Sequence, residues 1–362
     1  MRTVGVEEEL LLVDPESGEP QALAAAVLAR ASLADAGQDV FEKELYGQML
    51  EFATHPQSEM AELGEEIVRC RKEAAGLAGE LGCAVVALAS SPLPVSPSLS
   101  VNRRYQWMAE QYGIATREQL VCGCHVHVAV ESDEEGVGVL DRLRPWLPVL
   151  TAISANSPFW QGSDTGYASY RSRVWSRWPS AGPTGLFRTA GDYHRLVADM
   201  VATGVILDEA MVYFDARLAR RYPTVEIRVA DVCLRADTAV LVATLARALV
   251  ETAAREWRGG REPVDHGVCL QRMAAWRAAR SGLGGELLDP VSLRPRSVRA
   301  VLDALLEHTE DALADSGDLP AVRQAMERLL RHGNGAEEQR QLMERTDSLR
   351  DVVTECVRRT QG

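Results

Sequence analysis

The chain has 362 residues, 46% of them hydrophobic, and a formal net charge of −13. This length provides a core for one large domain or two ordinary ones. The negative charge argues against a nucleic-acid partner, which would require a basic face. We expect no membrane insertion, because the longest apolar run, residues 239–250, is interrupted by Arg247 and falls short of the ~18–20 residues that a span needs.

Cysteine and lysine usage restrict the compartment and the kind of nucleotide site. The seven cysteines form no CxxC pair, and the sequence begins with a strand pattern in place of a signal segment. We therefore expect a reducing, cytoplasmic compartment. Lysine occurs only at positions 43 and 72, and neither GxxxxGK[ST] nor GxGxxG is present. Any nucleotide site must therefore hold phosphates with arginine and metal ions.

In chain order, the first two thirds of the sequence mix strands with helices. Residues 3–13 read as a strand and are followed by a turn at 14–20, which is rich in Pro and Gly. Further strands are expected at 40–44, 48–54, 83–89, 120–130, 211–217 and 224–229. Helices are expected at 22–36, 58–81, 102–112 and 134–154, the last broken near Pro145 and Pro148.

Residues 156–188 form a long Gly/Pro/aromatic segment, which we interpret as a substrate loop. Long segments of this kind inside a compact domain are usually functional or disordered, and the aromatic residues argue against disorder. Between Ser163 and Arg188, four arginines accompany one acid, a local charge of +3 (four less one). The surplus indicates an anion site, although arginines paired with acids elsewhere would give the same pattern.

The last third reads as helical. Helices are expected at 237–257, 264–281, 295–313, 319–332 and 336–358. The sequence therefore predicts an α+β fold in one domain, 1–362. Its sheet-rich core would occupy 1–235 and its helical part 236–362.

Polar side chains recur at strand spacing within apolar strands. Glu226 and Arg228 share one face of their strand, while the valines and isoleucine between them face the other way. Three other strands repeat this design, so four strands can gather acids and imidazoles on one sheet face. The candidate metal ligands are Glu7, Glu9, Glu44, Glu51, His125 and Glu226.

The ligand set favours a hard cation. Carboxylate oxygens suit Mg²⁺ or Mn²⁺, and crowded carboxylates repel each other unless cations intervene. Arg228 could then stabilise charge on a transferring phosphoryl group. Two alternatives remain open. Each acid could lie on an ordinary solvated strand, or His125, His127 and Glu226 could serve a metal-dependent hydrolase or a cupin-type enzyme.

Seven stretches together resemble the bacterial carboxylate–amine ligase branch of the type-2 glutamate–cysteine ligases. The similarity runs in order over nearly the whole chain. The stretches are VGVEEE at 4–9, EFAT at 51–54, CGCHVHV at 122–128, NSPFWQG at 156–162, DTGYASYR at 164–171, WSRWP at 175–179 and PTVEIRVADVC at 223–233.

The resemblance implies a glutamine-synthetase-like fold, in which an antiparallel sheet curves into a funnel with helices outside. It implies a ligase that uses ATP and Mg²⁺, with Mn²⁺ as an alternative, to activate a small carboxylate, such as an amino acid, as an acyl phosphate. An amine then displaces the phosphate. Glutamate plus cysteine is the default substrate pair. The assembly state, a homodimer included, is left open.

The resemblance also implies roles for single residues. Met273-Ala274 and Ser281 depart from the family pattern, which leaves the amine acceptor open. The metal ligands would be Glu7, Glu9, Glu51, His125 and Glu226, with Glu44 a looser match. The catalytic residues would be Arg228 and Glu51, the nucleotide-binding residues Arg228 and His127, and the substrate-binding residues Arg171, Tyr167, Arg177 and Thr54.

Overall fold

The computed structural model describes residues 1–33 and 40–361 and is built around a seven-stranded sheet. Six strands run in the order β2-β3-β1-β5-β9-β8, β4 pairs with the far part of β1, and all these pairs are antiparallel. The strands are β1 (Val4–Val13), β2 (Phe41–Lys43), β3 (Met49–Ala53), β4 (Ala84–Val86), β5 (Gly123–Ala129), β8 (Ala216–Leu218) and β9 (Thr224–Asp231).

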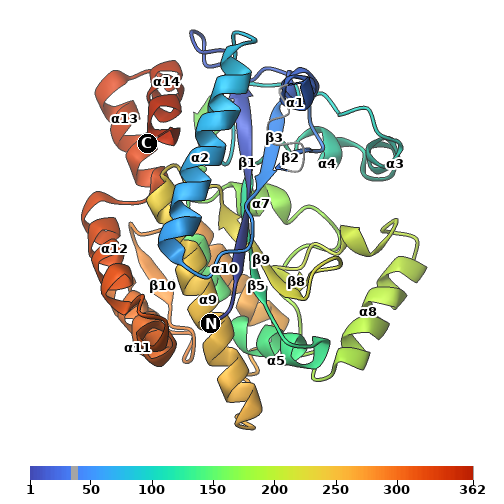
Figure 1. Cartoon of the computed structure of the whole chain (residues 1–362), viewed down its shortest axis with the longest axis vertical. Helices are drawn as coiled ribbons and strands as arrows, with labels where there is room; N and C mark the ends of the chain where they lie inside the picture. Colours follow the sequence, from blue (N-terminus) through green and yellow to red (C-terminus); the bar gives the residue numbers. More distant parts are fainter. Residues whose placement is uncertain (34–39, 362) are drawn as a thin grey trace.

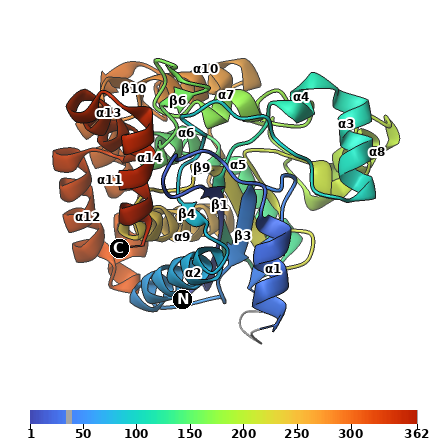
Figure 2. The same cartoon turned by 90° about the horizontal axis from the view of Figure 1, so that it is seen from above.

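One face of the sheet is covered by helices, among them α2 (Met60–Gly79) against β1, α6 (Leu147–Ser154) against β9, and α9 (Ala236–Arg258) against β1, β5 and β9. Figures 1 and 2 show α2 and α9 side by side on this face. α9 is rich in alanine, a strong helix former, and its buried side includes Leu241, Leu245 and Leu249. The other face of the sheet is left for the cavity described below.

Two groups of helices lie at the two sides of the sheet in both views. One side carries α3 (Arg103–Tyr112), α4 (Ile114–Arg117) and α8 (Ala190–Ala202), and the other carries α11 (Val298–Ser316), α12 (Leu319–His332), α13 (Gly335–Thr346) and α14 (Leu349–Thr360). The other elements are α1 (Ala24–Leu33), α5 (Asp133–Leu143), α7 (Arg171–Trp175), the 3-10 turn η1 (Glu209–Met211), α10 (Val268–Ser281) and the hairpins β6 (Phe159–Trp160)–β7 (Ser163–Asp164) and β10 (Glu286–Leu288)–β11 (Pro295–Ser297).

Strand alternation divides β1 between core and cavity. Val6 and Leu10 are buried, while Glu7 and Glu9 face the cavity. Glu8 points into the core, where it is fully buried and accepts two hydrogen bonds of 2.8 Å from Arg71 of α2. A buried carboxylate requires such pairing. Glu8 is therefore structural, because it points to the opposite side of the strand from Glu7 and Glu9.

Several sequence predictions of local structure were wrong. Residues 211–217 are not one strand, because η1 and irregular chain replace most of it and only β8 remains. The helix at 336–358 is two helices, separated at Asp347, which has a left-handed backbone with φ of 50°. Short α7, α8 and the hairpin β10–β11 were not expected. The helix predicted at 22–36 ends at Leu33 within the described residues, and its last positions lie outside them.

All seven cysteines are free thiols, and only Cys269 is exposed. Among residues 1–33 and 40–361, no helix combines the length and the apolar character needed to cross a bilayer. The hydrophobic core joins residues from the sheet with residues of α9, α11, α12 and α14. The division into one domain, with parts 1–235 and 236–362, stays a prediction.

Candidate active site

A cavity of about 1220 Å³ lies on the sheet face opposite α2 and α9. Alternate residues of four strands line it, among them Glu7, Glu51, His125 and Glu226. The residues between them, such as Val126 and Ile227, are buried in the core. The polar sheet face expected from the sequence is therefore present, and it lines this cavity.

Strand register brings the predicted ligands together. Glu7 lies opposite His125, Glu9 opposite Glu51, and His127 opposite Glu226. Directly opposite residues have Cβ atoms about 4.5–5.5 Å apart, so their side chains meet. The pairing of β5 with β9 shifts between Cys124 and Val126, where two residues of β9, Arg228 and Val229, lie opposite His125 alone. An extra residue of this kind bends its own strand, here β9.

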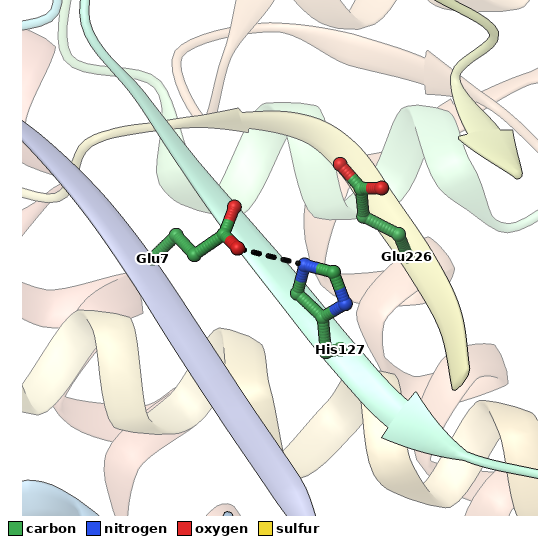
Figure 3. Close-up of side chains that lie close together, drawn as sticks. All are labelled: Glu7, His127 and Glu226. Atoms are coloured by element: carbon green, nitrogen blue, oxygen red, sulfur yellow. Dashed lines mark ion pairs between the residues drawn. The ribbon is translucent and has the colours of Figure 1, made fainter. Parts of the chain in front are cut away.

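The ligand atoms form three overlapping groups, within each of which all ligand atoms lie within 4.8 Å of one another. The groups are Glu7–His127–Glu226, Glu7–Glu51–His125 and Glu9–Glu44–Glu51. Glu7 belongs to the first two groups and Glu51 to the last two. Figure 3 shows the first group, in which side chains from β1, β5 and β9 converge and Glu7 forms an ion pair with His127. The three groups contain all six predicted ligands and add His127.

The protonation states suit cation binding. Burial, together with the Arg228 charge, lowers the pKa of His125 to about 4, so its imidazole is neutral at pH 7. Its Nε2 atom is buried without a hydrogen-bond partner, which leaves a lone pair for a cation. Burial and the charge of Glu9 raise the pKa of Glu44 to about 7, and burial with Glu44 raises that of Glu51 well above its usual value. A hard metal ion would compensate the charge of these crowded carboxylates.

Arginines border the acidic groups on the β8–β9 side. Arg217 Nε lies 2.7 Å from Glu226 Oε2, and Arg228 forms an ion pair with Glu226 Oε1. Burial raises the pKa of Glu226, but the charges of Arg228 and Arg217 outweigh it and hold the pKa far below its usual value. The rings of Trp175 and Tyr213 lie 5.6 and 5.9 Å from the Arg228 guanidinium carbon. The cavity therefore joins an acidic wall to a basic one.

The four predicted substrate residues lie in different places. Thr54 lines the cavity, and its hydroxyl accepts a hydrogen bond of 2.9 Å from Val6 N. Arg171 is only 1% exposed and lies behind the cavity wall, with Nη1 4.0 Å from Asp231 Oδ1.

Tyr167 and Arg177 do not line this cavity. Tyr167 accepts a hydrogen bond from Trp276 on α10, and Arg177 pairs with the exposed Glu118. A role of these two side chains in substrate binding stays a prediction.

Sequence reasoning missed part of the lining. Trp175, Trp178, Tyr213 and Arg217 all face the cavity. The polar alternation of Tyr213 and Arg217 was visible in the sequence, but nothing there paired Arg217 with Glu226. The tryptophans lie in the segment predicted as a substrate loop, where no strand or helix period indicates which side chains turn inward.

Comparison with known proteins assigns the class. The family model described as "Glutamate-cysteine ligase family 2 (GCS2)" matches residues 3–357, so the chain belongs to that family. It is therefore an enzyme of the ligase class, as the sequence resemblance predicted. The hydrolase or cupin alternative receives no support from these comparisons.

Particular relatives are similar over their full length. "Putative glutamate--cysteine ligase 2-1" of Streptomyces avermitilis is 74% identical over 362 residues, which is all of both chains. "Putative glutamate--cysteine ligase 2" of Streptomyces coelicolor is 70% identical, again over all of both chains.

Solved structures share the fold at low identity. Glutamate–cysteine ligase from Francisella tularensis, in complex with AMP, has a TM-score of 0.74 at 12% identity, covering 99% of this chain and 88% of that one. A bifunctional glutathione synthetase from Pasteurella multocida has a TM-score of 0.70 at 15% identity, covering 99% and 51%. The predicted α+β fold of this ligase type, with its antiparallel sheet and outer helices, is confirmed.

Proposed function

We propose that this chain is an ATP-dependent carboxylate–amine ligase that forms an amide through an acyl phosphate, with glutamate and cysteine as the default substrates. The observation that carries the proposal is the placement of three overlapping carboxylate–imidazole groups beside Arg228 in one cavity. Family membership supports the ligase class, and the AMP in the Francisella relative supports a nucleotide as co-substrate.

The donor set fits Mg²⁺ or Mn²⁺. Oxygen ligands dominate each group, and the imidazole of His125 is neutral with a free lone pair. Glu7, Glu9, Glu44, Glu51, His125 and Glu226 would hold the ions, with His127 adjoining both the ions and the nucleotide. Ions bound there would neutralise part of the charge on the phosphates of ATP.

The chain's own residues then orient the reacting groups. A substrate carboxylate oxygen attacks the γ-phosphorus, the bond to the β–γ bridging oxygen breaks, and ADP leaves. Arg228 lies at the basic wall, where its guanidinium can stabilise charge on the transferring group. The amine nitrogen next attacks the acyl carbon, phosphate leaves, and the nitrogen loses a proton. We keep Glu51 as a second catalytic candidate, because its carboxylate belongs to two of the three groups.

The test is a screen of carboxylate and amine pairs with ATP and Mg²⁺, in which product mass and nucleotide products are read together. We expect ADP and phosphate, and a hydroxamate when hydroxylamine replaces the amine. The Glu226→Gln variant controls for contaminating ATPases. Release of AMP and pyrophosphate would replace the acyl phosphate by an adenylate, and turnover without nucleotide would refute the ligase assignment.

A further inference from the structure

Asp231, the last residue of β9, carries a fully buried carboxylate that does not line the cavity. It accepts three hydrogen bonds: from Asn156 N at 2.8 Å, from the Ser157 hydroxyl at 2.7 Å and from the Ser169 hydroxyl at 2.8 Å. All three donors belong to the segment predicted as a substrate loop. One carboxylate on the central sheet thus fixes two separate points of that segment.

The same network sets the start of α7. The Ser157 hydroxyl donates to Asp231 and accepts a hydrogen bond of 2.9 Å from Arg171 N, the first residue of α7. The Arg171 side chain then returns to the sheet, where Nη1 lies 4.0 Å from Asp231 Oδ1 and Nη2 donates to the Arg228 carbonyl at 3.4 Å. Both ends of Arg171 are therefore tied to Asp231, directly or through Ser157.

From α7 the network reaches the cavity. Trp175, at the end of α7, lines the cavity, and its ring lies 5.5 Å from the Arg171 guanidinium carbon and 5.6 Å from that of Arg228. An aromatic face at this distance attracts a guanidinium. The position of α7 therefore affects both arginines, of which Arg228 is the candidate for phosphoryl transfer.

The fit around Arg171 leaves little room. A methyl group in place of the Gly123 hydrogen would come within 2.2 Å of Arg171 Nη2, and Gly123 N donates a hydrogen bond to Glu9. Arg171 thus touches the backbone group that orients a candidate metal ligand. A small displacement of α7 would therefore shift the surroundings of Glu9 as well as those of Arg228.

We propose that Asp231 is a positioning residue of this active site: through Ser157 and Ser169 it holds Arg171 and Trp175 against the cavity floor. The proposal rests on the proposed ligase function and assigns Asp231 no contact with substrate. A misplacement of about 1 Å can reduce an enzymatic rate ~100-fold. Loss of the Asp231 anchor is therefore expected to lower the rate without removing a substrate-binding group.

The test compares Asp231→Asn with a matched control. The amide keeps the shape of the carboxylate but presents a donor where the carboxylate accepts. Asp141 of α5 is the control, because it is also buried and anchors the other end of the same segment, accepting hydrogen bonds from Phe187 N at 2.7 Å and Arg188 N at 2.8 Å. It does not line the cavity.

We expect both Asp231→Asn and Asp141→Asn to lower the melting temperature. Only Asp231→Asn should lower kcat/KM for the carboxylate substrate, by roughly 100-fold, with the KM for ATP unchanged. A double variant with Trp175→Leu should be less than additive, because both changes disturb one unit. Equal kinetic losses in the two Asn variants, or unchanged kinetics in Asp231→Asn, would overturn the proposal.

Hydrogen exchange gives a readout that does not depend on turnover. Asp231→Asn should accelerate amide exchange over residues 169–178, whereas Asp141→Asn should do so only around 186–190. Unchanged exchange over residues 169–178 in Asp231→Asn would overturn the positioning proposal, whatever the activity of the chain. A wild-type chain that ligates no substrate pair would instead refute the proposed function. If Asp231→Asn does not fold, Ser169→Ala, which removes one hydrogen bond to Asp231, must show the same pattern at smaller amplitude.

Discussion

Glu9 of β1 and Glu51 of β3 lie directly opposite each other in the sheet register, and both carboxylates belong to one group of ligand atoms with Glu44. Burial raises the pKa of Glu9 and, together with Glu44, that of Glu51. Three acids placed so closely repel each other without a cation. The arrangement predicts a chain whose stability depends on a hard metal ion.

Mg²⁺ should therefore raise the free energy of unfolding at constant ionic strength. A ligand at 100 times its dissociation constant contributes about 2.7 kcal/mol. Glu51→Gln should abolish most of this increase and leave the metal-free protein at least as stable as the wild type, because it removes one crowded carboxylate. Glu134→Gln, an exposed acid on α5, is the control. Denaturation with and without Mg²⁺ measures the effect, and an equal Mg²⁺ response in Glu51→Gln would contradict it.

Glu226→Gln should lose ATP turnover by at least ~100-fold while staying folded, since it removes a charged candidate ligand beside Arg228. Glu226→Ala should in addition unfold more easily, by about 3–5 kcal/mol, because Arg217 and Arg228 lose their buried partner. Glu226 is only 2% exposed, so water cannot replace the lost partner of the two arginines. Urea denaturation measures the free energy of unfolding of this variant. Replacing Arg217 by alanine as well should recover part of the lost stability, because it removes one unpaired charge.

Arg171→Lys should raise the KM for the carboxylate substrate more than the KM for ATP, as expected from its proposed role at the acyl donor. Arg can form two parallel hydrogen bonds with a carboxylate and Lys cannot, a difference of roughly 2–4 kcal/mol. Arg173→Lys, two residues further along α7 and, like Arg171, outside the cavity lining, is the control, because Arg173 forms no contact with Asp231. A parallel rise in both KM values would show that Arg171 acts only through the fold.

We expect His308, which does not line the cavity, to make the stability of the chain depend on pH. Its ring stacks on Trp146 with 4.4 Å between centroids, and burial, with the Arg261 charge, lowers its pKa to about 4. Below pH 6.5 the unfolded chain binds a proton at His308 that the folded chain does not. The free energy of unfolding is therefore unaffected by His308 above pH 6.5 and falls as the pH is lowered from 6.5 towards 4.

His308→Phe keeps the stack and removes the titrating group. Chemical denaturation at pH 7 and pH 5 should therefore show a smaller loss of stability in the variant than in the wild type. Identical losses would show that the imidazole remains protonated, and therefore solvated, in the folded chain.

The sequence by itself determined the strands that carry the site. Alternation of apolar and charged residues in β1, β3, β5 and β9 sufficed to predict one polar sheet face, because side chains of a strand must point to opposite sides. All six predicted ligands lie in the three groups around the cavity. The family resemblance predicted the fold and the ligase class, and both are confirmed.

Only the tertiary structure decided what faces those strands. Register placed Glu9 opposite Glu51 and Arg217 opposite Glu226, and no single-strand pattern contains such pairings. The irregular segment 156–188 follows no period, so its sequence could not show that Arg171 is buried against Asp231 or that Trp175 faces the cavity. Contacts between residues distant in sequence fix these side chains, because hydrogen bonds to one buried carboxylate can be formed only once β9 and the segment have met.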